Sequence, residues 1–121
     1  MKTQILAEDF GAAVAARDHD TLGTLLGDEV RLRALLPARI VEDLGREAVL
    51  ARYVDWFGGY ARVELVRAAG DTVGDRLLIH YTVVADHEAG PHVLAQTLMC
   101  GVYGDRIGKI DLVCSGWRPA P

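Results

Sequence analysis

The stretch PHVLAQTLMCGVYGDRIGKIDLVCSGW, residues 91–117, decides the fold of this chain. It contains two segments, 93–103 and 107–117, that are rich in Val, Ile, Leu and Thr and are separated by a Gly-Asp-Arg turn. This composition predicts two long antiparallel strands with a tight connection. Because both segments are mostly apolar, the rest of the chain must cover at least one face of the sheet that they form.

The part of the chain before residue 91 supplies that cover. Apolar residues at helical spacing predict a helix over 3–17, a short helix around Leu22 that stops at Gly27, and a third helix from Gly45 to Gly58. Extended segments are predicted over residues 29–36, 39–44, 60–69 and 76–86, with turns at 70–75 and 89–90. This order of elements predicts an α+β fold in which helices cover one face of an antiparallel sheet.

The composition bounds the class of protein. With 121 residues, half of them hydrophobic and a quarter charged, we expect one domain spanning residues 1–121. The net charge of −4 argues against nucleic acid or an anionic membrane as a partner. No apolar run is long enough for a transmembrane helix and no signal-peptide layout is present, so a cytoplasmic protein is expected. The preference for Arg over Lys is typical of a GC-rich bacterial genome.

Several short motifs occur in the order found in a known superfamily. They are Phe10, Ala-Arg-Asp-His-Asp at 16–20, Leu-Leu-Gly-Asp-Glu-Val at 25–30, Gly-Arg-Glu-Ala at 45–48 and Gly-Lys-Ile at 108–110. In these residues the chain resembles the nuclear transport factor 2-like (NTF2-like) superfamily, in particular its ketosteroid-isomerase-like and SnoaL-like polyketide cyclase branches. The resemblance implies a cone, in which a strongly curved antiparallel or mixed sheet wraps around the helices and holds an apolar small molecule in its open end. It also implies a homodimer through the outer face of the sheet.

The strand pairing predicts which residues share a face. A two-residue hairpin turn at Ala89 and Gly90 would place His80 opposite Met99 and Thr82 opposite Thr97. By the resemblance, this is the concave face, which also receives Val84 and the last-strand residues Asp111, Val113, Ser115 and Trp117. The other face would then carry Leu94, Gln96, Leu98, Cys100, Leu112 and Cys114. It is too apolar to face water, so a homodimer is expected to cover it. A slip of one residue would exchange the two faces.

The positions that carry chemistry in ketosteroid isomerases are occupied here by other residues. The resemblance places Ala34 where those enzymes have the general base, and Phe10 and Met99 where they have the oxyanion-hole Tyr and Asp. Trp117 and Arg118 stand where SnoaL-like cyclases have a late-strand Asp. Methyl, phenyl and thioether groups transfer no proton, so a standard ketosteroid isomerase reaction is not expected.

His80 is the first candidate for a catalytic group, because an imidazole can serve as acid, base or hydrogen-bond donor near neutral pH. The alternative is a structural histidine that is hydrogen-bonded within the fold. Asp111 is the second catalytic candidate, with a rim carboxylate as the alternative. The expected substrate-binding residues are Phe10, Tyr53, Thr82, Val84, Thr97, Met99, Val113, Ser115 and Trp117. No cofactor and no metal are expected, since His87 and His92 are too few for a metal site and Cys100 and Cys114 lack metal-type spacing.

Three functions remain open from the sequence. The first is a cofactor-free cyclase, isomerase or dehydratase acting on an apolar molecule such as a polycyclic polyketide- or steroid-like compound. The second is a non-catalytic protein that binds or sequesters such a ligand, and the third is a structural dimer module whose cone is filled by its own side chains. An inward His or Arg facing a void would favour the enzyme. A void with a purely apolar lining would favour the binding protein, and the absence of a void would favour the structural module.

Overall fold

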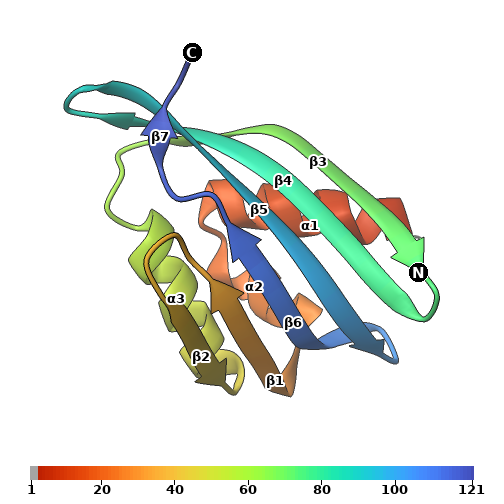
Figure 1. Ribbon diagram of the computed structural model, residues 1–121. Helices are drawn as coiled ribbons and strands as arrows, with labels where there is room; N and C mark the ends of the chain where they lie inside the picture. The colour runs from red at the N-terminus through yellow and green to blue at the C-terminus, as the bar shows by residue number, and fades with distance from the viewer. Residues whose placement is uncertain (1–2) are drawn as a thin grey trace.

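The computed structural model describes residues 3–121, with their side chains from Leu6 onward. Ile5, which the helical spacing of apolar residues places on the buried stripe of the first helix, lies outside the described side chains. The described chain forms three helices: α1 (Thr3–Ala16), α2 (His19–Leu25) and α3 (Arg46–Phe57). Its seven strands are β1 (Leu26–Leu35), β2 (Ile40–Leu44), β3 (Val63–Val73), β4 (Arg76–His87), β5 (Gly90–Tyr103), β6 (Arg106–Cys114) and β7 (Arg118–Pro119). The order along the chain (Figure 1) confirms the predicted α+β class.

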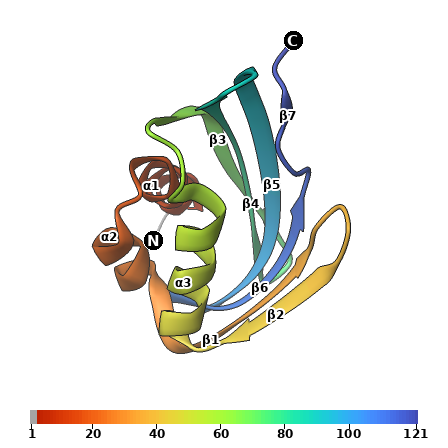
Figure 2. The same cartoon turned by 90° about the vertical axis from the view of Figure 1, so that its left-hand side faces the viewer.

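All strands belong to one mixed sheet, in the order β2-β1-β6-β5-β4-β3, with β7 paired to the start of β5. The β1–β6 pair is parallel and the others are antiparallel. The sheet is strongly curved, and Figure 2 shows the three helices on its concave side. Helix α1 packs on β3 and β4, and α3 packs on β1 and β2, so the helices fill the hollow of a cone.

The helices bury the faces that their apolar spacing predicts. In α1 the stripe of Leu6, Phe10, Ala13 and Val14 is buried. Gly11 lies on the same helix where it approaches β3, and a Cβ there would come within 2.9 Å of the Ala68 Cβ. Asp18 then caps α2 by accepting hydrogen bonds from the Thr21 backbone N–H (3.1 Å) and hydroxyl (2.6 Å), which lower the pKa of its carboxyl.

Several strand limits differ from the sequence prediction. β1 begins at Leu26, directly after α2, and β3 runs from Val63 through the segment 70–73 that was expected to be a turn. The β3–β4 turn is reduced to Gly74 and Asp75, because Gly74 adopts a φ of 62° that a two-residue hairpin requires. The last predicted strand ends at Cys114, and Trp117 lies in the connection to β7.

The predicted concave face is wrong. The β4–β5 turn lies at Glu88 and Ala89, and His80 pairs with Thr97 instead of Met99, a shift of two residues that keeps the same residues together on each face. However, the helices cover the other face, where the buried residues include Leu77, Ile79, Tyr81, Val83, Gln96, Leu98, Cys100, Ile110, Leu112 and Cys114. Alternation shows which residues share a face, but both faces here are apolar, so alternation alone does not show which one the helices bury.

Candidate functional site

The centre of the cone is filled by three aromatic side chains. Phe10 of α1 stacks on Tyr81 of β4, with ring centroids 5.9 Å apart, and meets Tyr53 of α3 edge-on at 6.0 Å. Phe10 and Tyr81 are wholly buried and Tyr53 is almost so. Because a ligand at this point would have to displace these rings, the centre of the cone is core packing.

A directed chain of hydrogen bonds crosses this buried centre. The Tyr81 hydroxyl donates to Gln96 Oε1, so the 3.0 Å bond between Tyr53 and Tyr81 must be donated by Tyr53. The Gln96 amide nitrogen donates onward to Cys114 Sγ at 3.4 Å. Burial raises the pKa of both tyrosine hydroxyls, which therefore stay protonated at neutral pH. Each hydroxyl proton is thus used inside the fold, and neither is free to stabilise an oxyanion.

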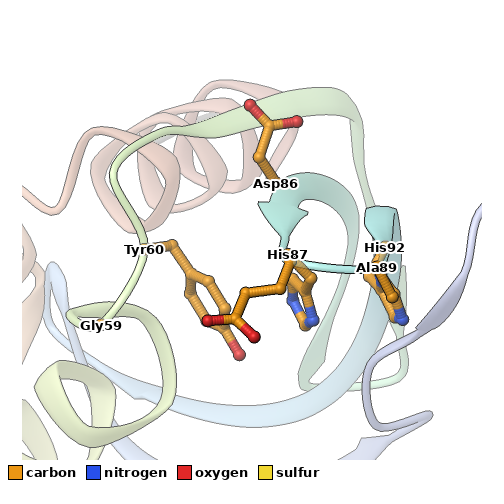
Figure 3. Close-up of a pocket in the computed structure, with 7 residues that line it drawn as sticks. Gly59, Tyr60, Asp86, His87, Ala89 and His92 are labelled. Carbon is orange, nitrogen blue, oxygen red and sulfur yellow. The ribbon is translucent and has the colours of Figure 1, made fainter.

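The mouth of the cone carries a second aromatic group, which we call the mouth stack: Tyr60, His87, His92 and Trp117. The His87 ring lies parallel to Tyr60 on one side (4.6 Å) and to His92 on the other (4.0 Å). Trp117 meets Tyr60 at 4.9 Å and His87 at 5.2 Å, both at a tilt. Beside this stack lies a pocket of about 460 Å³, the mouth pocket, lined by Gly59, Tyr60, Asp86, His87, Glu88, Ala89 and His92 (Figure 3).

The positions of these rings follow from the local structure. His87 continues the alternation of β4 residues that face the helices, and His92 does the same at the start of β5, so both point to the concave side. Tyr60 follows the end of α3, where the Arg17 guanidinium donates hydrogen bonds to the carbonyls of Tyr60 and Ala61. Gly116, at a φ of 72°, turns the chain after β6 and brings Trp117 over the mouth.

The two mouth histidines differ in their hydrogen bonds. His92 Nδ1 lies 3.0 Å from the Gly90 carbonyl, which only accepts, so Nδ1 carries a proton and Nε2 is the nitrogen left to accept a hydrogen bond. His87 Nε2 is buried and has no hydrogen-bond partner among the described residues. Partial burial, and then the neighbouring His92, lower the pKa of His87, so this imidazole is neutral at pH 7. A neutral, unpaired imidazole beside a pocket can accept or donate a proton.

The structure places the two predicted catalytic residues on the outer face. His80 is hydrogen-bonded within the sheet, with Nδ1 2.8 Å from the Thr97 hydroxyl and Nε2 3.5 Å from that of Thr82. This arrangement matches the alternative of a structural histidine. Asp111 forms ion pairs with Arg33 (3.6 Å) and Lys109 (3.9 Å) on the same outer side. Neither side chain lines the mouth pocket.

The predicted substrate-binding residues divide between the two faces. Phe10, Tyr53 and Trp117 lie on the concave side, as predicted. The prediction of an inward position is wrong for Thr82, Val84, Thr97, Met99 and Val113, which alternate with the buried residues of their strands. The Ser115 hydroxyl accepts a hydrogen bond from the Ala95 N–H at 2.9 Å and donates to the Gly116 carbonyl at 2.8 Å, so it holds the chain after β6 in place. Cys100 and Cys114, predicted on the outer face, are free thiols buried on the helix side.

The outer face has a groove of its own, the outer groove, of about 650 Å³. Apolar side chains of the β1–β2 hairpin and of β4, β5 and β6 make most of its wall. Its lining residues are Arg33, Leu35, Ile40, Glu42, Leu78, Thr97, Met99, Asp111, Leu112 and Val113. Three expected substrate-binding residues, Thr97, Met99 and Val113, thus line this groove together with Asp111, on the side away from the helices.

Sequence reasoning missed the residues of the buried hydrogen-bond chain and of the mouth stack. Tyr81 and Gln96 were assigned to the covered outer face or left out, and Tyr60, His87 and His92 were not placed in a site. The sequence did contain a signal for them. If the two strand faces are exchanged, as a one-residue slip would do, Tyr81, His87 and His92 all turn inward together.

The fold and the mouth pocket define a class: a curved-sheet cone whose helices fill the centre and whose open end is lined by aromatic and imidazole rings. Solved structures share the fold of this cone. A provisionally described polyketide cyclase from Pseudomonas putida superposes with a TM-score of 0.70 at 18% identity, over 93% of this chain and 90% of that one. A protein with a ketosteroid isomerase-like fold from Catenulispora acidiphila, in complex with trimethylamine, gives 0.68 at 16% identity, over 92% and 85%. An NTF2-like protein of unknown function from Burkholderia xenovorans gives 0.65 at 18% identity, over 96% and 84%.

The chain therefore has the NTF2-like fold, which confirms the resemblance carried by its motifs. No protein-family model matches the chain, and no curated protein matches it either. Among the described residues, no helix is long and apolar enough to cross a membrane. No group of three or more His, Cys, Asp or Glu side chains in residues 3–121 is arranged to hold a metal ion.

Proposed function

We propose that this protein binds a small organic molecule in the mouth pocket, without a cofactor. The observation that carries the proposal is His87, a residue that lines this pocket and whose Nε2 is buried without a hydrogen-bond partner among the described residues. Buried polar atoms are nearly always paired, and an unpaired one calls for an explanation such as a catalytic role or a bound molecule. A ligand bearing a complementary polar group would supply the missing partner.

The proposed ligand is smaller than the polycyclic compound expected from the sequence. The buried rings of Phe10, Tyr53 and Tyr81 occupy the centre of the cone, which leaves the mouth as the place for a ligand. A pocket of about 460 Å³ is within the usual range for small-molecule sites. Structural neighbours described as a polyketide cyclase and as bound to trimethylamine support a ligand-binding role for this fold.

If the protein is an enzyme, His87 is the group that we propose for proton transfer. Its pKa is lowered, so at neutral pH it is an unprotonated base, as general base catalysis requires. No reaction class beyond cofactor-free acid–base chemistry, such as isomerisation, cyclisation or dehydration, follows from the site. Binding without turnover is the second candidate, favoured by the fully used hydroxyls of Tyr53 and Tyr81, which leave no oxyanion donor at the centre.

The test is a thermal-shift screen of small polar organic compounds against wild type, His87→Gln and His80→Gln. A compound present at about one hundred times its dissociation constant adds roughly 2.7 kcal/mol of stability. We expect hits for wild type and for His80→Gln, whose substitution lies on the outer face, and weaker shifts for His87→Gln. Equal shifts for all three proteins would place the ligand outside the mouth pocket and refute the proposal.

We also propose a homodimer through the outer face of the sheet, in the cytoplasm, where the free thiols of Cys100 and Cys114 would stay reduced. The supporting observation is the outer groove, flanked by the exposed apolar side chains of Leu35, Ile40 and Val113. Contiguous apolar patches of this kind mark interaction surfaces.

A further inference from the structure

We infer that the ligand of the mouth pocket is a compact organic cation with N–H donors, such as a primary ammonium. This inference rests on the proposed function, and it follows from the hydrogen-bonding capacity, the charge and the shape of the pocket wall.

The hydrogen-bonding groups of the wall are mostly acceptors. The proton on His92 Nδ1 is donated to the Gly90 carbonyl, which leaves His92 Nε2 as an acceptor. The carboxylate of Glu88 adds two acceptor oxygens. The Tyr60 hydroxyl acts as donor or acceptor. A ligand that satisfies this set must itself bring donors.

The charge of the wall is negative. Asp86 and Glu88 are among the residues that line the mouth pocket, and no Lys or Arg is. Asp86 alternates with the inward-facing His87 on β4 and its side chain points away from the rings (Figure 3), so Glu88 carries the negative charge at the wall itself. The nearby arginines are directed elsewhere: Arg17 donates to the backbone carbonyls of Tyr60 and Ala61, and Arg62 pairs with Glu64 at 3.3 Å. Arg118 pairs with Val93 across the β5–β7 ladder, and Val93 belongs to the outer face, so Arg118 faces outward as well. The unbalanced charge at the mouth therefore attracts a cation.

The shape of the wall argues against a flat ligand that stacks. Both faces of the His87 ring are already covered, by Tyr60 at 4.6 Å and by His92 at 4.0 Å. In Figure 3 the rings of Tyr60, His87 and His92 lie side by side, so a ligand at these rings is left with their edges. Ring edges and lone pairs suit a compact charged group, and the electron-rich rings of Tyr60 and Trp117 add cation–π attraction where such a group approaches them.

A metal ion is the other cation to consider, and the described residues disfavour it. No cluster of three or more ligating side chains is arranged around the pocket or elsewhere in residues 3–121. His87 and His92 supply two nitrogen atoms at most from the mouth stack, whereas stable zinc sites use three or four protein ligands. An organic ammonium needs no such geometry.

The experiment compares three probes of the same shape: cyclohexylamine, cyclohexanol and cyclohexanecarboxylate, titrated at pH 7.5 by calorimetry. Binding at the mouth is followed by Trp117 fluorescence in a Trp56→Phe background, which removes the other tryptophan. We expect cyclohexylammonium to bind roughly tenfold more tightly than cyclohexanol and the carboxylate not to bind. The affinity for the amine should fall as salt is added, and that for the alcohol should not.

Variants separate the local charge from the overall charge. In Asp86→Asn/Glu88→Gln the pocket keeps its shape and loses both carboxylates, so the preference for the amine should disappear. The control Asp75→Asn/Asp105→Asn makes the same change of net charge in the β3–β4 and β5–β6 turns, and it should bind the amine like wild type.

Each other outcome overturns the inference in a distinct way. Equal binding of cyclohexanol and cyclohexylamine at Trp117 would refute the cation and leave the proposed function standing. Binding of none of the probes, nor of any compound in the thermal-shift screen, would refute both. Amine binding that survives Asp86→Asn/Glu88→Gln would place the amine elsewhere. Stabilisation by Zn²⁺ that His92→Gln abolishes, without any effect of amines, would make this a metal site.

Discussion

Replacing Tyr81 by Phe tests whether the centre of the cone is a satisfied, directed hydrogen-bond chain. The Tyr81 hydroxyl accepts from Tyr53 at 3.0 Å and donates to Gln96 Oε1, and all three side chains are buried. Tyr81→Phe therefore leaves two buried groups unpaired, the Tyr53 hydroxyl proton and the Gln96 carbonyl oxygen. Tyr53→Phe leaves the Tyr81–Gln96 bond intact and removes one hydrogen bond only.

The magnitudes follow from this difference. Each buried polar group that loses its partner costs about 1–3 kcal/mol, so the two left by Tyr81→Phe should lower the free energy of unfolding by about 2–6 kcal/mol. Tyr53→Phe should cost about 0.5–1.5 kcal/mol, the net value of one hydrogen bond. An unfolding entropy of about 2.1 cal/mol/K per residue over 121 residues makes 1 kcal/mol equal to roughly 4 °C in Tm. The expected decreases in Tm are therefore roughly 8–24 °C for Tyr81→Phe and roughly 2–6 °C for Tyr53→Phe.

Urea and thermal unfolding of the two variants measure both quantities, with Tyr103→Phe as the matched control. Tyr103 is 68% exposed on β5, so loss of its hydroxyl should change stability by about 0.5 kcal/mol or less. If Tyr53→Phe costs as much as Tyr81→Phe, the direction of the chain is wrong. If Tyr81→Phe unfolds like wild type, the hydroxyls are not a satisfied buried network, and the centre of the cone would again be open to a ligand.

Three further predictions concern the mouth, the thiols and the outer face. The pKa of His87 in the folded protein lies below its unfolded value of about 6.5, so the unfolded state takes up the proton first as the pH falls. The free energy of unfolding should therefore decrease below about pH 6.5. The urea midpoints at about pH 7.5 and about pH 5.0 should differ less in His87→Gln than in wild type. Burial raises the pKa of Cys100 to about 12, so this thiol should resist alkylation at pH 8 until urea unfolds the protein. Rapid labelling of Cys100 in the native state would contradict its buried position. Val113→Asp should change the mass measured by light scattering from that of a dimer to that of a monomer. Val66→Asp should not, although the Val66 side chain is exposed to a similar extent (59%, against 56% for Val113). A monomeric wild type at micromolar concentration would refute the dimer.

The sequence predicted the fold well because its signals are local or periodic. The apolar stripe of α1, the turn glycines and the alternation in β4 and β5 depend on neighbours a few residues apart. They gave the element order and the α+β class, and the family motifs added the cone. The two-residue shift in the β4–β5 hairpin did not disturb the grouping of residues by face, because side chains alternate with a period of two.

The candidate site was predicted poorly because it depends on which of two apolar faces the helices bury. His80, Thr97 and Met99 share a face with one another in either arrangement, and only the packing of Phe10 on Tyr81 selects the concave one. The mouth stack could not be predicted from the sequence either, since Tyr60, His87 and Trp117 come from three separate connections or strand ends. Their rings meet because Arg17 holds the end of α3 and Gly116 redirects the chain after β6.

By itself, then, the sequence determined the order of the helices and strands and the sets of residues that share a strand face. The tertiary structure alone decided which set faces the helices, that Tyr53 and Tyr81 satisfy one another at the centre, and that two histidines from a hairpin stack at the mouth. The physical reason is that periodicity is a property of a single strand, whereas the buried face and the meeting of distant rings are set by how helices pack on a curved sheet.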